Sequence, residues 1–210
     1  MTKKQRAAQM IKLLREEYPD VKCALTYQKP HELLIATRLS AQCTDKRVNM
    51  VTPALFERFP TIDAFAEAEV TEIEEYIKSC GLYHTKANDI SLMCRDLRDR
   101  FGGVVPDTIE ELTTLPGVGR KTANLMVGDL FGKPAVVCDT HVIRITNLMG
   151  LTDTKDAEKV EKELVALIPP EEGCMMCHRL VWHGRLVCIA RRPQCDKCCL
   201  KDICKNAKDK

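Results

Sequence analysis

Apolar residues recur at intervals of three and four along most of the chain, which is the spacing of one face of an α-helix. A first helix is expected from Lys4 to Tyr18, with Ala7, Ile11 and Leu14 on one face. Pro30 opens a second helix, which runs through Leu39, and Asp45 can cap the next one. A capping box at Thr71–Glu74 opens a helix that ends near Gly81. Two more helices are expected, one through Ile90 and Phe101 that stops at Gly102, and one from Thr154 to Leu167.

Strand alternation is not convincing anywhere in the sequence. The run from Ala135 to Cys138 has the composition of a strand, but it is short and has no partner. The sequence therefore predicts an all-α fold. Its 210 residues are enough for one large or two small domains, each with an adequate core.

The net charge of +2 hides an uneven distribution. From His183 to Lys210 the chain has eight lysine or arginine residues and three aspartates, a balance that fits contact with phosphates. Within this segment, Arg191 and Arg192 are the preferred candidates for such contacts, whereas Lys205–Lys210 is expected to be a solvated tail. No stretch of eighteen apolar residues occurs, so no membrane span is expected.

A glycine turn joins two predicted helices in the middle of the chain. Thr108–Glu111 has the pattern of a capping box at the start of a short helix. Pro116 and Gly117 would end that helix, and a second helix is expected to start near Arg120 and end at Gly132. Such a hairpin can hold a DNA backbone, because Gly119 permits close approach and the second helix points its amides at an anion. An ordinary connection between two helices is the alternative interpretation.

Lys121 and Asp139 are the candidates for chemistry. Lys121 lies in the first turn of the second helix, where the helix dipole disfavours a cation, and a lysine must be neutral to attack carbon and form a Schiff base. Asp139 precedes Thr140 and can cap the helix that begins there. A carboxylate fixed in this way is also well oriented to stabilise positive charge, so both roles stay open.

Four cysteines near the C-terminus form the second strong signal. Cys188, Cys195, Cys198 and Cys204 are separated by six, two and five residues. Four thiols so close together predict a metal ion or an iron–sulfur cluster, and their spacing does not choose between zinc and iron. Disulfides are not expected, because the sequence shows no secretory signal.

These segments together resemble the endonuclease III family of the helix-hairpin-helix DNA glycosylase superfamily. The resemblance extends from Leu33 to Cys204. It rests on Leu39–Asp45, Gly81–Tyr83, Leu115–Ala123, Asp139–His141, His183–Arg185 and the four cysteines. The chain departs from most members at Cys43, where they have a small residue, and at Thr113, where they have an acidic one.

The resemblance implies a function and a role for individual residues. The expected activity is base-excision repair, in which oxidised pyrimidines are removed from duplex DNA and the abasic strand is cleaved by β-elimination. Lys121 is then the nucleophile and Asp139 the catalytic carboxylate. The four cysteines hold a [4Fe-4S] cluster, with Cys199 a spectator. The remaining expected DNA contacts are Gln42 and Leu82, which fill the gap left by an extruded nucleotide, Gly117, Gly119, Arg120, His141, Arg191 and Arg192.

The resemblance also implies two helical lobes. Residues 22–133 would form a helical barrel with the helix-hairpin-helix motif, and residues 1–21 plus 134–210 an iron–sulfur cluster domain. Lys121 and Asp139 would face each other across the cleft between them. The expected partner is damaged double-stranded DNA, and the protein is expected to be a cytoplasmic, nucleoid-associated monomer.

Two other functions remain open at this stage. The first is a mismatch glycosylase of the same superfamily that lacks lyase activity. Such enzymes have a hydroxyl residue where this chain has Lys121. The second is a DNA-binding redox sensor that uses the cluster without catalysis, which would not need Lys121 together with Asp139.

Overall fold

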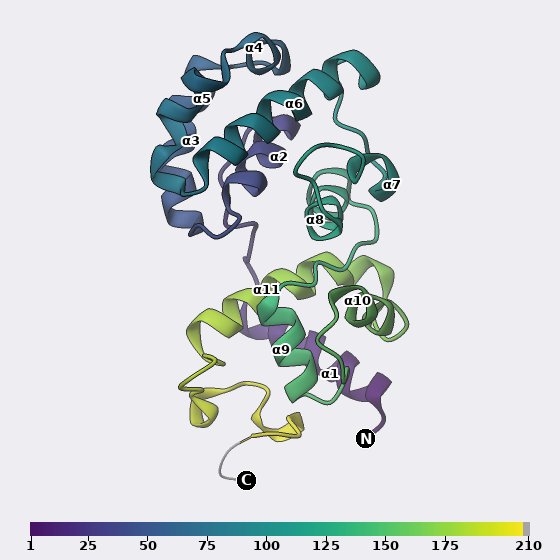
Figure 1. Cartoon of the computed structure of the whole chain (residues 1–210). Helices are drawn as coiled ribbons and strands as arrows, with labels where there is room; N and C mark the ends of the chain where they lie inside the picture. The colour runs from purple at the N-terminus through teal and green to yellow at the C-terminus, as the bar shows by residue number, and fades with distance from the viewer. Residues whose placement is uncertain (208–210) are drawn as a thin grey trace. The chain divides into compact units, whose positions relative to one another are not determined.

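A computed structural model describes residues 1–207, and no β-strand occurs among them (Figure 1). The predicted all-α fold is confirmed. The α-helices are α1 (Lys3–Glu17), α2 (Pro30–Leu39), α3 (Asp45–Arg58), α4 (Ile62–Glu67), α5 (Val70–Ile77), α6 (Tyr83–Phe101), α7 (Ile109–Leu112), α8 (Arg120–Phe131), α9 (Thr140–Leu148), α10 (Ala157–Val165) and α11 (Gly173–Leu186). Short 3₁₀ helices are η1 (Lys78–Cys80), η2 (Pro170–Glu172), η3 (Cys195–Lys197) and η4 (Lys201–Ile203).

The chain divides into two compact units, of which one is Cys23–Phe131 and contains α2 to α8. Helix α2 lies in its core, with Leu33 to Ala36 fully buried, because this helix is apolar on nearly all sides. Helix α6 packs against α4 and α5 and also contacts α2, and Figure 1 shows α6 beside α4 and α5. The short helix α7 packs on α8, and α8 packs on α2.

The other unit joins Met1–Lys22 to Gly132–Lys210. Helix α11 packs against both α9 and α1. The apolar face of α1 that the sequence predicts is buried, and Met10 belongs to it as well. Thr2 caps α1, since its side chain accepts a hydrogen bond from the Gln5 amide at 3.2 Å. The sequence-based division into domains 22–133 and 1–21 plus 134–210 assigns the chain to two separate domains, and this assignment stays a prediction.

Several predicted helix starts are wrong by a few residues. Asp45 is the first residue of α3 and not its cap, because Thr44 accepts the Arg47 amide. Thr71 lies inside α5, which begins at Val70 without a side-chain cap. Helix α10 begins at Ala157, where Asp156 accepts the Lys159 amide at 3.0 Å. In each case another side chain, or none, satisfies the first free amides of the helix.

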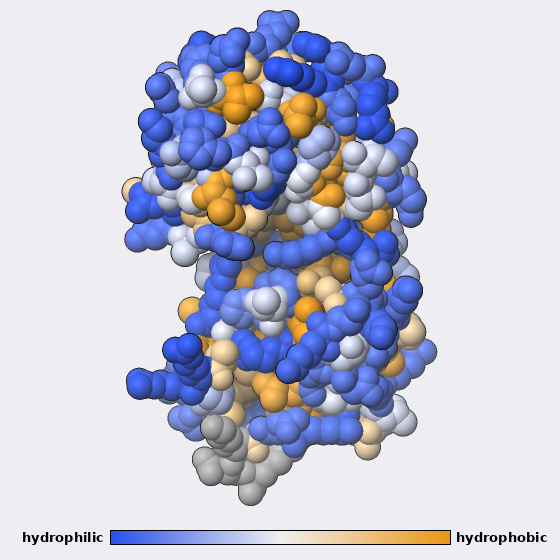
Figure 2. Space-filling view, in the orientation of Figure 1, coloured by the Kyte–Doolittle hydropathy of each residue, from blue (hydrophilic) through white to orange (hydrophobic). Residues whose placement is uncertain are grey.

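Helix α4 follows Pro60 and was not predicted. It has six residues and is capped by Thr61, whose hydroxyl accepts the Ala64 amide. Most of the surface drawn in Figure 2 is polar, with small scattered hydrophobic patches. None of the helices described is both long and apolar enough to cross a membrane.

Candidate functional site

The predicted hairpin is present between α7 and α8. Thr108 caps α7, with its hydroxyl accepting the Glu111 amide at 3.2 Å and donating to the Glu111 carboxylate at 2.7 Å. Val118 donates its amide to the Leu115 carbonyl, which closes the turn. The Ala123 amide donates to the Gly119 carbonyl at 3.0 Å, so α8 takes its first helical bond from Gly119. The amides before Ala123 have no carbonyl partner within the helix and can face an anion.

The two glycines of the hairpin differ in what surrounds them. Gly117 has a φ of 74°, and a Cβ added there would lie 2.7 Å from Nε of Arg38. Arg38 forms an ion pair with Asp89, so the hairpin rests on a charged pair that joins α2 to α6. A Cβ on Gly119 would meet no atom within 4 Å. The fold therefore requires glycine at 117, whereas the space beside Gly119 is free for a ligand.

Lys121 lies in the first turn of α8, as predicted, and its side chain is exposed. Its neighbour Arg120 is exposed too. Thr113 donates its hydroxyl to the Ile109 carbonyl at 2.9 Å. Position 113 therefore contributes a hydroxyl group to the hairpin and not a carboxylate.

Gln42 and Leu82 share an unusual backbone conformation. Their φ angles are 54° and 50°, and no other non-glycine residue among 1–207 has a positive φ. A left-handed conformation costs a residue with a side chain about 1–3 kcal/mol, and such strain is concentrated at functional sites. Leu82 is 56% exposed although it is apolar, and Gln42 is exposed as well. Both lie in the unit Cys23–Phe131 and protrude from short connections, Gln42 between α2 and α3, and Leu82 between η1 and α6.

Asp139 and His141 lie in the other unit, at the start of α9. The Asp139 carboxylate accepts the Val142 amide at 2.8 Å, so its predicted role as a cap is confirmed. His141 packs against α11, because a Cβ on Gly184 would lie 2.5 Å from Nδ1 of His141. The missing side chain at Gly184 thus lets α9 approach α11 closely and fixes the end of the helix that carries Asp139.

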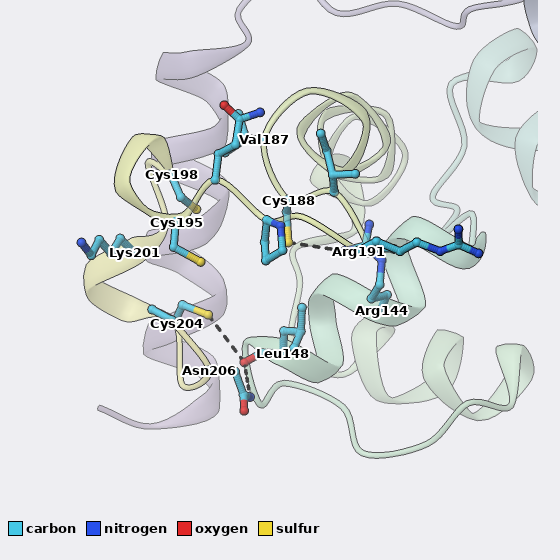
Figure 3. A pocket seen from close by; sticks show the side chains of 15 residues that line it. Arg144, Leu148, Val187, Cys188, Arg191, Cys195, Cys198, Lys201, Cys204 and Asn206 are labelled. Atoms are coloured by element: carbon cyan, nitrogen blue, oxygen red, sulfur yellow. Dashed lines mark hydrogen bonds between the residues drawn. The ribbon is translucent and has the colours of Figure 1, made fainter. Parts of the chain in front are cut away.

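The four predicted cysteine ligands line one cavity of about 260 Å³ (Figure 3). Nη1 of Arg144 donates to Sγ of Cys188 at 3.4 Å, and Sγ of Cys204 donates to the Leu148 carbonyl at 3.7 Å. Cys199 is not part of this lining. A water molecule occupies about 30 Å³ in the liquid, so the cavity has room for a group of several atoms. Four thiols around one such space fit a metal ion or an iron–sulfur cluster.

Burial raises the pKa of Cys198 to about 11 and that of Cys199 to about 12. The Arg144 hydrogen bond lowers the pKa of Cys188 but does not outweigh the burial. A metal that binds Cys188 and Cys198 must therefore displace a proton from each of these thiols.

His183 is part of this site, and the sequence analysis gave it no role. It is almost fully buried, and burial lowers its pKa to about 4, so the ring is neutral. Its Nδ1 lies 3.1 Å from the Tyr18 hydroxyl and its Nε2 lies 3.4 Å from Sγ of Cys198. Its position in the helix before the first cysteine was the available signal, but Tyr18 is 165 residues away in sequence.

Arg191 and Arg192 lie on the loop between Cys188 and Cys195, and both side chains are exposed. Figure 3 shows the Arg191 side chain extending away from the thiols. This placement leaves it free to contact phosphates. Lys208 and Lys210, which contribute to the basic segment, lie outside the described residues.

Comparison with known proteins places this architecture in a family. The family model described as HhH-GPD superfamily base excision DNA repair protein matches residues 35–170. Endonuclease III of Synechocystis sp. is 47% identical over 98% of this chain and 94% of its own length. Endonuclease III of Haemophilus influenzae is 41% identical over 96% of this chain and 95% of its own length. A solved structure of a trapped endonuclease III–DNA covalent intermediate superimposes with a TM-score of 0.93 at 42% identity, covering 99% and 98% of the two chains.

The chain therefore belongs to the endonuclease III family within the HhH-GPD superfamily of base excision DNA repair proteins. The resemblance inferred from the motifs is confirmed, as is the predicted class of enzyme, a DNA glycosylase with abasic-site lyase activity. The roles assigned to individual residues remain predictions.

Proposed function

We propose that this protein removes oxidised pyrimidine bases from duplex DNA and then cleaves the strand at the abasic site through a Schiff base on Lys121. The observation that carries the proposal is an exposed lysine in the first turn of the helix after a glycine hairpin, in a chain closely similar to a protein trapped covalently on DNA. A lysine amine is one of the groups that can form such a covalent intermediate.

The reaction uses one amine and one carboxylate. The neutral amine of Lys121 attacks C1′ of the sugar, and the damaged base departs with the bonding electrons. Asp139 stays ionised and stabilises the positive charge that develops on the sugar, while its hydrogen bond to the Val142 amide fixes its direction. The C1′–O4′ bond then breaks as O4′ takes a proton, and the ring-opened imine that results makes the 2′ proton acidic. Loss of that proton breaks the bond to the 3′ phosphate by β-elimination, and hydrolysis of the imine then frees Lys121.

The proposed DNA contacts come from exposed groups on each unit. In the unit Cys23–Phe131, the space beside Gly119, the amides at the start of α8 and Arg120 hold a phosphate. Gln42 and Leu82 fill the gap that an extruded nucleotide leaves in the stack. In the other unit, Arg191 and Arg192 contact the backbone. His141 supports α9 by packing on Gly184, so its contribution to DNA contact is through the placement of this helix.

Cys188, Cys195, Cys198 and Cys204 hold a [4Fe-4S] cluster. The four thiols that line one cavity support such a group, and the membership of the endonuclease III family favours the cluster over zinc. The cluster supplies a covalent cross-link for the loop that carries Arg191 and Arg192. Damaged double-stranded DNA is the partner, and the protein acts as a monomer on the chromosome in the cytoplasm.

The first experiment is borohydride trapping on a duplex that contains an oxidised pyrimidine. Wild-type protein should give a covalent adduct and strand cleavage. Lys121→Gln should give neither, while it binds a duplex with an uncleavable abasic analogue as well as wild type does. Arg120→Gln is the matched control, because it removes a charge from the same helix end without removing the amine, and it should still be trapped. Undiminished trapping of Lys121→Gln would rule out the assignment.

The same assay separates the two alternative functions. On a duplex that carries a mismatch in place of the oxidised base, a mismatch glycosylase without lyase activity would release a base without trapping or strand cleavage. A redox sensor would bind DNA and leave every substrate intact.

A further inference from the structure

Lys86 is the fourth residue of α6 and has no exposed surface. Its Nζ donates hydrogen bonds to two backbone carbonyls, that of Leu39 at 2.7 Å and that of Cys80 at 2.8 Å. Among residues 1–207, no carboxylate lies within ion-pair distance of this amine. Lysine is rarely buried without a paired charge, because removing an ammonium from water is costly. Its position therefore needs an explanation other than ordinary core packing.

The two carbonyls belong to the last residues of α2 and η1, and each of these elements leads directly into a connection that contains a residue with positive φ. Leu39 is the last residue of α2, and Gln42 follows it by three residues. Cys80 is the last residue of η1, and Leu82 follows it by two. One amine therefore joins the starts of the two connections that carry the only non-glycine residues with positive φ in the described chain.

Two further contacts hold the same region. The Lys86 amide donates to the Leu82 carbonyl at 3.0 Å, so Lys86 holds the second connection through its backbone as well as its side chain. Asp89 lies one turn further along α6 and forms its ion pair with Arg38, the residue before Leu39. Lys86 and Asp89, one turn apart on α6, thus hold the end of α2 at Arg38 and Leu39, and Lys86 also holds the end of η1 at Cys80.

The thiols nearest to Lys86 do not replace these carbonyls as partners. Cys43 and Cys80 both act to raise the pKa of Lys86, but burial has the larger effect and lowers it. Burial, and then the neighbouring Cys43, raises the pKa of Cys80 to about 11, so this thiol is neutral at physiological pH. The hydrogen bonds to Leu39 and Cys80 are therefore what holds the amine in place.

We propose that Lys86 is a positioning residue that holds Gln42 and Leu82 in fixed register with each other, so that both enter the duplex together when a nucleotide is extruded. The inference rests on the proposed function for the role of Gln42 and Leu82. Lys86 itself is buried and touches no DNA. It acts by making the two short connections one rigid unit, which lowers the conformational freedom lost when they enter the stack.

The structural part of the test uses the free full-length protein and needs no substrate. In Lys86→Met, an apolar side chain of similar length replaces the amine and leaves both carbonyls without their donor. Hydrogen exchange should become at least tenfold faster at the amides of Cys43 and Gly81, which donate to the Ser40 and Lys78 carbonyls. Lys78→Met, which removes an exposed lysine from η1, is the matched control and should leave both amides unchanged. Faster exchange at only one amide, or at neither, would overturn the proposal.

The functional part compares two substrates of the proposed reaction. Lys86→Met should lower base excision from a duplex at least tenfold, and it should lower β-elimination on a single-stranded abasic site less than twofold, because no base pair has to be opened there. In a Gln42→Ala/Leu82→Ala background, the same substitution should cause less than a twofold further loss. A purely structural role would lower both reactions in parallel and persist in that background, and this result would refute the proposal.

Two additional outcomes are covered by this design. If Lys86→Met yields too little folded protein, Lys86→Leu, which also lacks a hydrogen-bond donor, takes its place, and the same ratio of the two activities decides the question. If wild-type protein acts on neither substrate, the proposed function fails, whereas the exchange result still decides whether Lys86 holds both connections.

Discussion

Arg38 and Asp89 form an ion pair, with Nη2 of Arg38 2.6 Å from Oδ2 of Asp89, and Gly117 lies directly against it. Both side chains are largely buried. The pair therefore supports the hairpin at Gly117, whereas no protein atom fills the space beside Gly119. Structural support and ligand contact are thus assigned to different glycines of one turn.

The two hairpin glycines should respond differently to the same substitution. Gly117→Ala places a methyl group 2.7 Å from Arg38 in a backbone conformation that alanine disfavours, so it should lower the free energy of unfolding by about 1–3 kcal/mol. Gly119→Ala meets no protein atom and should change that free energy by less than about 0.5 kcal/mol. It should nevertheless weaken binding to duplex DNA several-fold. Urea unfolding and fluorescence anisotropy measure the two quantities, and equal stability losses in both variants would contradict this division.

The cysteines give a second pair of matched variants. Because Cys188 lines the cavity and Cys199 does not, Cys188→Ala should lose iron and most of the folded yield, whereas Cys199→Ala should keep both. Elemental analysis and the broad visible absorption of an iron–sulfur protein provide the measurements. Stoichiometric zinc without iron in the wild-type protein would reject the cluster.

The contact between α9 and α11 can be tested by a double-mutant cycle. Gly184→Ala should destabilise the protein by about 1–3 kcal/mol, because the new methyl group would lie 2.5 Å from Nδ1 of His141. His141→Ala removes the obstructing ring, so the double variant should be more stable than the sum of the two single effects predicts. Additive effects would show that the ring is not what excludes a side chain at position 184.

Features set by neighbouring residues could be predicted from the sequence. Thr108 and Asp139 cap their helices as expected, since a cap depends on residues two or three positions away. Thr71–Glu74 has the same pattern as a capping box and failed, because burial of Ile73 and Ile77 sets the position of α5 and places Thr71 within it. A capping pattern therefore predicts a helix start only where packing does not decide it.

Lys86 and His183 could not be predicted from local patterns. A lysine within an amphipathic helix reads as a solvent-exposed residue, and the Leu39 carbonyl that accepts its hydrogen bond is 47 residues away. His183 depends in the same way on Tyr18 and Cys198. Both are buried polar groups whose partners are brought together only by the packing of helices. By contrast, Lys121 and the four cysteines could be proposed as site residues from the sequence, because their residue types and spacing are visible there.

Asp139 has two roles that a pair of substitutions can separate. Asp139→Ala removes the hydrogen bond to the Val142 amide and should cost about 0.5–2 kcal/mol of stability. Asp139→Asn keeps most of the cap, because asparagine caps helices about as well as aspartate, yet it removes the charge. Base excision by Asp139→Asn should therefore fall roughly a hundredfold or more, the scale expected when one preorganised electrostatic group is lost.

The measurement is single-turnover excision at a temperature where each variant is fully folded. Binding to an uncleavable abasic analogue is the control, and it should be unchanged in Asp139→Asn because the phosphate contacts come from the hairpin and the arginines. If the carboxylate only caps α9, Asp139→Asn will excise bases at the wild-type rate and Asp139→Ala will lose activity only as far as it loses folded protein. That pattern would remove Asp139 from the catalytic pair and leave Lys121 to act with another group.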